Sequence, residues 1–180
     1  MSAAESPPDS TIVIDSSVLF AMGGPTNEKC QAFERFVRRR NITVRVPQRV
    51  AEELGESPDD YGYQRDRLEH AREAGWLESA TIDFSIPRVS TVVDKTRHRM
   101  QQLSADDVTE DQIEKTDTVL AGLAYQYASN EPRHVTVLVS DRVAHRAIED
   151  VLTAVGVDDR TQVVEGRAFL QRLLSESTEN

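Results

Sequence analysis

Two short apolar segments of the chain each end in an aspartate. Residues 11–14 precede Asp15, and residues 135–139 precede Ser140 and Asp141. Short β-branched runs are typical of strands that are buried on both faces of a sheet. Neighbouring parallel strands end at one edge about 5 Å apart, so two such carboxylates can share a cation. Either aspartate alone fits a turn or helix cap better than a site, but the two together reverse this preference.

Two further acids lie on predicted helices. Glu53 directly precedes Leu54 near the end of a helix that begins at Pro47, and Glu52 fits the border of the same apolar face almost as well. Asp117 lies in the first turn of a helical segment whose inner face includes Leu120. Spacing alone therefore leaves Glu52 and Glu53 as alternatives, and either one can face the sheet edge beside Asp117.

The residue types favour a hard cation. Cys30 is the single cysteine, and the four histidines have no metal-ligand spacing, which excludes a thiolate zinc cluster. Carboxylates alone select Mg²⁺ or Mn²⁺. These ions activate water and stabilise charge on phosphate, so the candidate chemistry is phosphoryl displacement.

Alternating strand and helix signals surround these acids and predict an α/β fold. We expect a three-layer α/β/α sandwich with a central, mostly parallel sheet, in one domain over residues 11–174 between flexible tails at 1–10 and 175–180. Ligands of such sheets bind beyond the carboxyl ends of the strands. The strands are predicted at 11–14, 42–46, 76–82, 134–140 and 162–164, and the helices at 28–39, 47–54, 64–74, 87–102, 106–128, 143–155 and 167–174, with a turn after Asp15 and a loop at 56–63.

The composition limits where in the cell the protein can act. The chain has 21 basic and 31 acidic residues, a net charge of −10, and no apolar run near the ~20 residues that cross a bilayer. The first ten residues lack the pattern of a secretory signal, so we expect a cytoplasmic protein without a membrane partner. Acids spread along the whole chain suggest a solvated surface suited to high salt.

Several stretches, in order, resemble a PIN-domain protein. They are TIVIDSSVLF, VPQRVAEEL, TDTVLAGLAYQYA, VTVLVSDRVAHRAI and VVEGRAFLQRL, which together extend over about residues 11–174. The resemblance implies an α/β sandwich and an endoribonuclease that depends on Mg²⁺ or Mn²⁺. Its relatives include the toxins of VapBC-type toxin–antitoxin pairs.

The resemblance also implies roles for individual residues. Asp15, Glu53, Asp117 and Asp141 match the family's four acids, and Glu53 is favoured over Glu52 because the family's acid directly precedes leucine. Ser17 and Ser140 match hydroxyls that orient the metal's water or this edge of the sheet. The sequence departs from the family at two places: Ser140 and Asp141 are adjacent where many members have Thr-x-Asp, and the stretch 56–114 is longer than in small toxins.

An RNA substrate requires local positive charge. The densest basic run includes Arg38, Arg39, Arg45 and Arg49, which we predict to contact RNA phosphates, and residues 95–99 form a second basic group. Ion pairs with acids such as Glu34 explain the run equally well.

The leading expectation is a metal-dependent endoribonuclease that acts in RNA processing, decay or as a toxin, with RNA as its substrate and an antitoxin or a second copy as protein partner. The alternative is a catalytically inactive PIN-like module that binds RNA or protein. A phosphatase or phosphoacceptor domain is a third possibility, since Asp15 ends a strand there too, but the required second acids are absent near Asp15.

Overall fold

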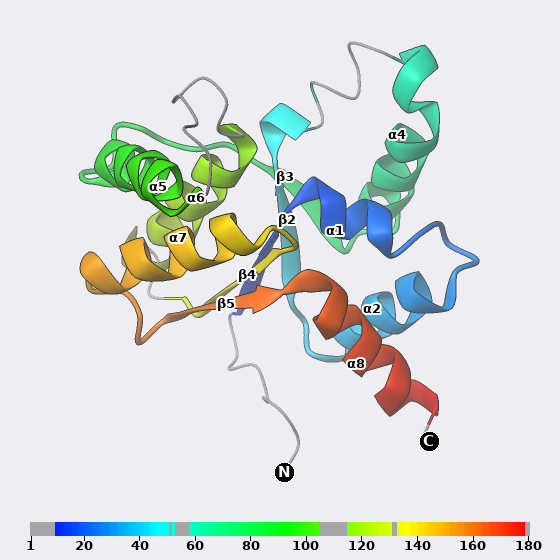
Figure 1. The fold of residues 1–180 in the computed structure, drawn as a ribbon. Coiled ribbons are helices and arrows are strands. Elements are labelled where there is room, and N and C mark those ends of the chain that lie inside the picture. The colour runs from blue at the N-terminus through cyan, green and yellow to red at the C-terminus, as the bar shows by residue number, and fades with distance from the viewer. Residues whose placement is uncertain (1–9, 51, 53–57, 105–114, 131–132, 179–180) are drawn as a thin grey trace.

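An all-parallel sheet of five strands lies at the centre of the computed structural model (Figure 1), with strand order β3-β2-β1-β4-β5. The structure describes residues 10–50, 52, 58–104, 115–130 and 133–178. The strands are β1 (Thr11–Ile14), β2 (Thr43–Pro47), β3 (Leu77–Ala80), β4 (Val135–Val139) and β5 (Thr161–Glu165). The helices are α1 (Ser16–Ala21), α2 (Glu28–Arg39), α4 (Pro58–Glu73), α5 (Val89–Leu103), α6 (Lys115–Asn130), α7 (Arg142–Ala154) and α8 (Gly166–Thr178).

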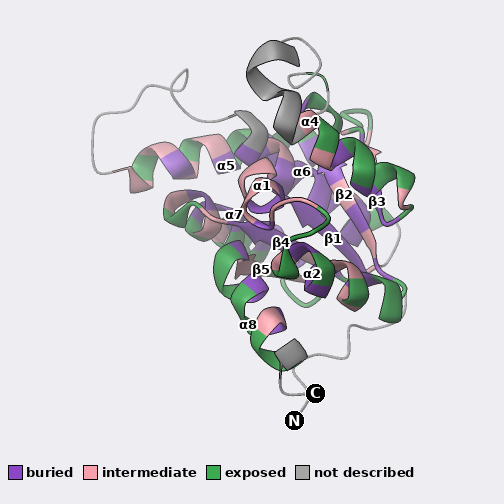
Figure 2. Ribbon diagram, turned by 90° about the vertical axis from the view of Figure 1, so that its right-hand side faces the viewer, coloured by how far each residue is buried: buried purple, intermediate pink, exposed green. Residues whose placement is uncertain are grey.

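Helices cover both faces of the sheet, which confirms the predicted three-layer sandwich. In β1, Val13 packs on the side of α5, α6 and α7, whereas Ile12 and Ile14 pack on the side of α1, α2, α4 and α8. This alternation follows from the two-residue period of a strand. Figure 2 shows the buried strands between helices whose outer faces are exposed. Burial on both faces explains why the central strands β1 and β4 have few polar residues.

The helices bury one apolar side and are capped by side chains at their starts. Asn27 caps α2 by accepting from the amide of Lys29 at 2.9 Å, and the buried side of α2 includes Phe33 and Val37. Asp141 caps α7 by accepting from the amide of Ala144 at 2.8 Å. Such caps satisfy amides that have no partner inside the helix, and each contributes about 1 kcal/mol.

The strand order reverses between β1 and β4. From β1 the chain adds β2 and β3 on one side, and it then crosses to add β4 and β5 on the other side. Ile14 is in register with Leu138, so the two strands end level with each other. In open α/β sheets, the crevice at such a switch point is where ligands bind.

Four local predictions differ from the structure. The turn expected after Asp15 is the helix α1, and Pro47 ends β2 rather than beginning a helix. Helix α4 begins at Pro58, inside the predicted loop 56–63, because proline fits the first turn of a helix. Helix α8 continues to Thr178, past the start of the predicted tail at 175. Three of these differences lie at the end of an element, where sequence periodicity is weakest, whereas α1 is a complete short helix in place of a predicted turn.

Candidate active site at the switch-point edge

Asp15 lies at the carboxyl end of β1 and is almost buried, with 8% of its surface exposed. Its Oδ2 accepts a 2.6 Å hydrogen bond from Ser17 Oγ, and its Oδ1 lies 3.5 Å from both Ser16 Oγ and the amide of Ser17. These contacts make Asp15 the N-cap of α1. Within the described part of the chain, no lysine, arginine or histidine forms an ion pair with Asp15. A buried carboxylate without a countercharge is costly, so this geometry favours a bound cation.

Asp117 is also buried, with 6% of its surface exposed, in the first turn of α6. Helix α6 packs against β1, β2 and β4 and leads back to the amino end of β4. The start of α6 therefore lies toward the carboxyl ends of the strands. The structure thus places Asp15 and Asp117 toward the same edge of the sheet.

Ser140 and Asp141 follow β4, the strand next to β1. Asp141 is exposed and its carboxylate caps α7, so part of its hydrogen-bonding capacity is used by the helix. Ser140 Oγ is buried without a hydrogen-bond partner among the described residues. A buried hydroxyl that lacks a partner is costly and indicates a water or ligand that the hydroxyl would contact.

The remaining predicted ligand is outside the described residues. Glu53 belongs to that undescribed part, and its neighbour Glu52 is exposed and accepts a 3.2 Å hydrogen bond from Gln48 Nε2. No three acidic, histidine or cysteine side chains of the described residues converge as a metal site. Asp15, Asp117 and Asp141 are therefore brought to one edge of the sheet, without forming a complete metal cage among themselves.

A glycine that the sequence prediction missed allows α1 and α8 to pack closely beside this edge of the sheet. Gly166 begins α8, and a Cβ at this position would overlap Val18 Cγ2 and lie 2.8 Å from Val18 Cγ1. Val18 is fully buried in α1, one residue after Ser17. The only sequence signal was a glycine directly after a strand ending in Glu165, and that pattern alone does not reveal a close approach between α1 and α8.

The four predicted RNA-binding arginines are at different places on the sheet. Arg38 and Arg39 end α2, which returns the chain to the amino end of β2, so they lie at the edge opposite Asp15. Arg38 pairs with Glu34 at 3.1 Å and donates to Ala74 O at 2.6 Å. Arg49 follows the carboxyl end of β2, toward the edge of Asp15.

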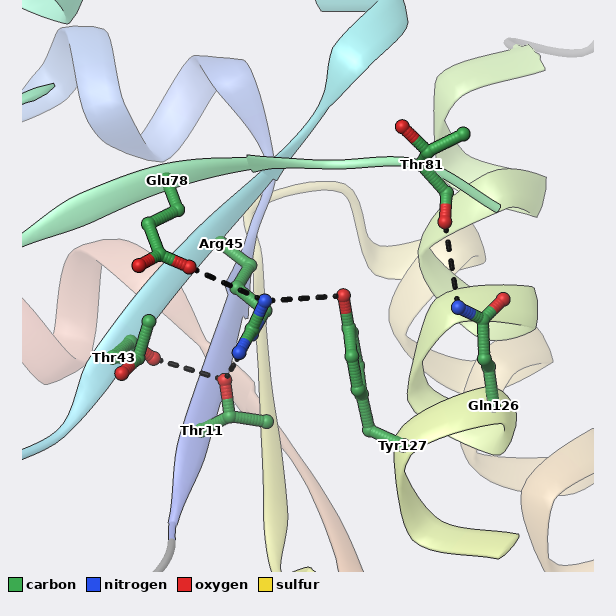
Figure 3. Close-up of polar contacts among 7 residues, drawn as sticks. All are labelled: Thr11, Thr43, Arg45, Glu78, Thr81, Gln126 and Tyr127. Atoms are coloured by element: carbon green, nitrogen blue, oxygen red, sulfur yellow. Dashed lines mark hydrogen bonds and ion pairs between the residues drawn. The ribbon is translucent and has the colours of Figure 1, made fainter. Parts of the chain in front are cut away.

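Arg45 is used inside the protein, as Figure 3 shows. Its guanidinium lies over the ring of Tyr127 with 4.7 Å to the ring centroid, and its Nε donates to Thr11 Oγ1 at 3.2 Å. Nη1 lies 3.4 Å from both Tyr127 Oη and Glu78 Oε2. Only 18% of the Arg45 side chain is exposed, so these contacts give it a structural role between β1, β2 and α6.

Comparison with protein families adds a decisive observation. The model of the halobacterial PIN domain matches residues 8–178. The chain belongs to this PIN-domain family. Comparison with curated proteins gives no match, and comparison with solved structures gives none either. The match confirms the resemblance inferred from the sequence.

Membership of the family fits the observed fold. The PIN domain here has a five-stranded parallel sheet between two helical layers, and Asp15, Asp117 and Asp141 lie toward the carboxyl edge of the sheet. PIN domains are generally nucleases, typically with divalent metal ions and RNA as substrate, so membership of the family supports a nuclease-type function. A search of the described residues finds no helix that is both long and apolar enough to span a membrane.

Proposed function

We propose that this PIN domain is a metal-dependent endoribonuclease that hydrolyses RNA phosphodiester bonds at the β1/β4 edge. The observation that carries the proposal is the burial of Asp15 at the switch point of a PIN-domain sheet, where no described residue forms an ion pair with its carboxylate. Asp117 adds a second buried acid on the same side of the sheet. The same chemistry serves RNA processing, RNA decay or toxin action.

The residues at this edge fit a divalent cation. Asp15, Asp117 and Asp141 offer hard oxygen donors, which suit Mg²⁺ or Mn²⁺. The Ser140 hydroxyl, which has no hydrogen-bond partner among the described residues, directly precedes Asp141 in the chain and offers a hydrogen bond to a water or a phosphate oxygen. When bound, such a cation lowers the pKa of a water and stabilises the negative charge that develops on the phosphate. Glu53 is proposed as a further ligand from its sequence motif alone.

The side chains have separate roles in this proposal. Asp15 and Asp117 hold the cation, and Asp141 supplies oxygen to the same edge while it caps α7. Ser17 orients the Asp15 carboxylate through its 2.6 Å hydrogen bond. The carboxylates act as ligands and not as nucleophiles, and a water in line with the leaving oxygen attacks the phosphate.

The test compares RNA cleavage by the wild-type chain with cleavage by Asp15→Asn and Asp117→Asn, in Mn²⁺, in Mg²⁺ and after chelation. We expect each variant to lose cleavage by about 100-fold or more, because a neutral amide holds a divalent cation poorly. Asparagine is as good an N-cap as aspartate, so Asp15→Asn should keep α1 folded. Circular dichroism and the melting temperature check the fold.

Asp158→Asn is the matched control, because Asp158 is exposed in the turn before β5, at the opposite end of the sheet. It removes the same charge and should cleave like the wild type. Unchanged cleavage by Asp15→Asn or Asp117→Asn would contradict the site. RNA binding without cleavage by the wild-type chain, in saturating Mn²⁺, would instead favour a binding module.

A further inference from the structure

Beside the proposed active site, a groove of about 650 Å³ runs between the ends of β2 and β3 and the helices α5 and α6. Thr118 and Val119, which follow Asp117 directly, line one side of the groove. Pro47 and Ala80, the last residues of β2 and β3, lie at its end. The groove therefore lies beside the start of α6, next to Asp117.

An exposed aromatic ring also lines this groove. Phe84 is 57% exposed, and among the described residues no other large apolar side chain is exposed. Exposing an aromatic ring to water forgoes the favourable free energy of its burial, so a ring presented in a groove marks a contact surface. The ring therefore lines a groove beside a site where the proposed substrate is a nucleic acid.

Hydrogen bonds hold the segment around Phe84 in place. The side-chain amide of Gln126 donates to Thr81 O at 3.3 Å and accepts from the amide of Asp83 at 2.8 Å, and Figure 3 shows its bond to Thr81. Asp83 Oδ1 accepts from Ser85 Oγ at 2.6 Å and from the Ser85 amide at 2.9 Å. These two bonds, the side-chain one first, favour the charged carboxylate and so lower the pKa of Asp83. The backbone on both sides of Phe84 is thus held in place, which reduces the entropy that this segment loses on binding.

The floor of the groove depends on a glycine. A Cβ on Gly122 of α6 would lie 2.5 Å from Ile82 Cδ1 and 2.8 Å from Val93 Cγ2, and both of these side chains line the groove. The absence of a side chain lets the segment before Phe84 pack directly on α6.

The charges of the groove are mixed. Arg49 and Arg97 line it together with Glu52, so the excess of positive charge is small. Arg97 forms a 3.0 Å pair with Asp94 on the same helix, and the Asp94 side chain is largely exposed. Exposed pairs of this kind contribute little, so the guanidinium can exchange Asp94 for a phosphate oxygen.

These charges and the composition favour stacking over ionic attraction. The chain has a net charge of −10 and belongs to a halobacterial family. At molar salt the Debye length is about 3 Å, so phosphate contacts are heavily screened. Base stacking on an aromatic ring is short-ranged and needs no net charge. Bases of a duplex are already stacked, so the ring selects unpaired bases.

We propose that this groove binds an unpaired nucleotide of the RNA substrate next to the cleaved bond, with its base stacked on Phe84 and its phosphate facing Arg97. This inference rests on the proposed nuclease function and assigns a nucleotide contact to Phe84, beside the proposed site.

The experiment measures kcat and KM for a short single-stranded RNA in Mn²⁺ at high potassium chloride, with the wild type, Phe84→Ala and Phe84→Trp. Phe84→Ala should raise KM by about tenfold and leave kcat nearly unchanged, because stacking is lost while the acids stay in place. Phe84→Trp should restore KM. An RNA whose bases are removed at the positions beside the cleavage site should be bound equally by the wild type and Phe84→Ala.

Two further variants distinguish the contribution of the Phe84 ring to RNA binding from the contributions of Gln126 and Arg97. Gln126→Ala removes the clamp on residues 81–83 and should raise KM while the kcat stays within about twofold. Arg97→Gln should weaken binding mainly at low salt, and Arg39→Gln, at the opposite edge, is its matched control. Because Phe84 is exposed, its replacement should leave the melting temperature unchanged.

The outcomes distinguish this inference from the nuclease proposal. If the wild type cleaves RNA and Phe84→Ala has an unchanged KM, the proposal that the groove binds a nucleotide is wrong. The exposed ring would then be assigned to a contact with a protein. If the wild type does not cleave RNA, the affinity for fluorescent RNA is measured instead. An affinity about tenfold lower for Phe84→Ala than for the wild type supports nucleotide binding in the groove. Equal binding by both forms overturns it.

Discussion

The amide of Asp15 donates a 3.0 Å hydrogen bond to the carbonyl oxygen of Leu138, so the ends of β1 and β4 are tied together. Ser140 lies two residues beyond Leu138, which brings its hydroxyl to the same edge as Asp15. This relationship gives the first prediction, because Ser140 Oγ is buried and has no hydrogen-bond partner among the described residues.

Ser140→Ala is expected to lower RNA cleavage by about tenfold without lowering stability, because it removes a hydroxyl that costs free energy in the absence of substrate. Ser79→Ala is the matched control, since Ser79 Oγ in β3 is also buried without a partner within the described residues. Urea unfolding should show unchanged or higher stability for both variants, and only Ser140→Ala should lose cleavage. Equal cleavage by the two variants would remove Ser140 from the site.

Gly166→Ala is expected to lower both stability and cleavage. The new Cβ would overlap Val18, and overpacking of a dense core costs about 1–3 kcal/mol of unfolding free energy. The strain would displace α1 and with it Ser17, which orients Asp15. Urea unfolding and kcat together measure the effect.

Two controls isolate the contact between α1 and α8. Gly24→Ala should have little effect, since the nearest atom to its Cβ would be Arg67 Nε at 3.9 Å. The double variant Gly166→Ala with Val18→Ala should recover part of the cleavage lost by Gly166→Ala, because the overlapping methyl groups are removed. No recovery would indicate that Gly166 acts through another neighbour.

Arg45→Met is expected to lower the free energy of unfolding by about 1–2 kcal/mol, because it removes the cation over the ring of Tyr127 and the hydrogen bond to Thr11. The ion pair of Arg45 with Glu78 contributes little to the free energy of unfolding, since the Glu78 side chain is 59% exposed. Kd for single-stranded RNA should stay unchanged. Arg39→Met, on the exposed end of α2, should change neither property by much. Weaker RNA binding by Arg45→Met, with an unchanged free energy of unfolding, would instead support the direct RNA contact that the sequence predicts for Arg45.

Cys30 gives a prediction about pH. Burial, and then the nearby Glu34 charge, raise the pKa of its thiol in the folded protein. The folded state therefore disfavours the thiolate, and stability should be full below the pKa of an unfolded thiol, about 8.5, and fall as the pH rises past it. Urea unfolding between pH 8 and 10 measures this slope, which Cys30→Ala should reduce. An identical slope in the variant would assign the loss of stability to other groups.

The sequence alone determined the class of the fold and much of the edge where the acids lie. Apolar runs that end in Asp15 and Asp141 predicted two buried parallel strands, and helical periodicity predicted the layers around them. These signals are local, because the period of a strand or helix is written in a few successive residues. The boundaries were less certain, as the short helix α1 after Asp15 shows.

Only the tertiary structure decided which of these residues work together. The order of the strands, with β1 beside β4, is a non-local property that no short pattern encodes. The same is true of the arginines, which look equivalent in sequence: Arg38 lies at the amino edge, Arg45 packs on Tyr127, and Arg49 lies toward the acids. The close approach of Gly166 to Val18 and the exposure of Phe84 likewise depend on contacts between segments far apart in the chain. Packing between distant segments determines which side of a residue is exposed to water. The spacing of residues along the sequence does not predict that packing.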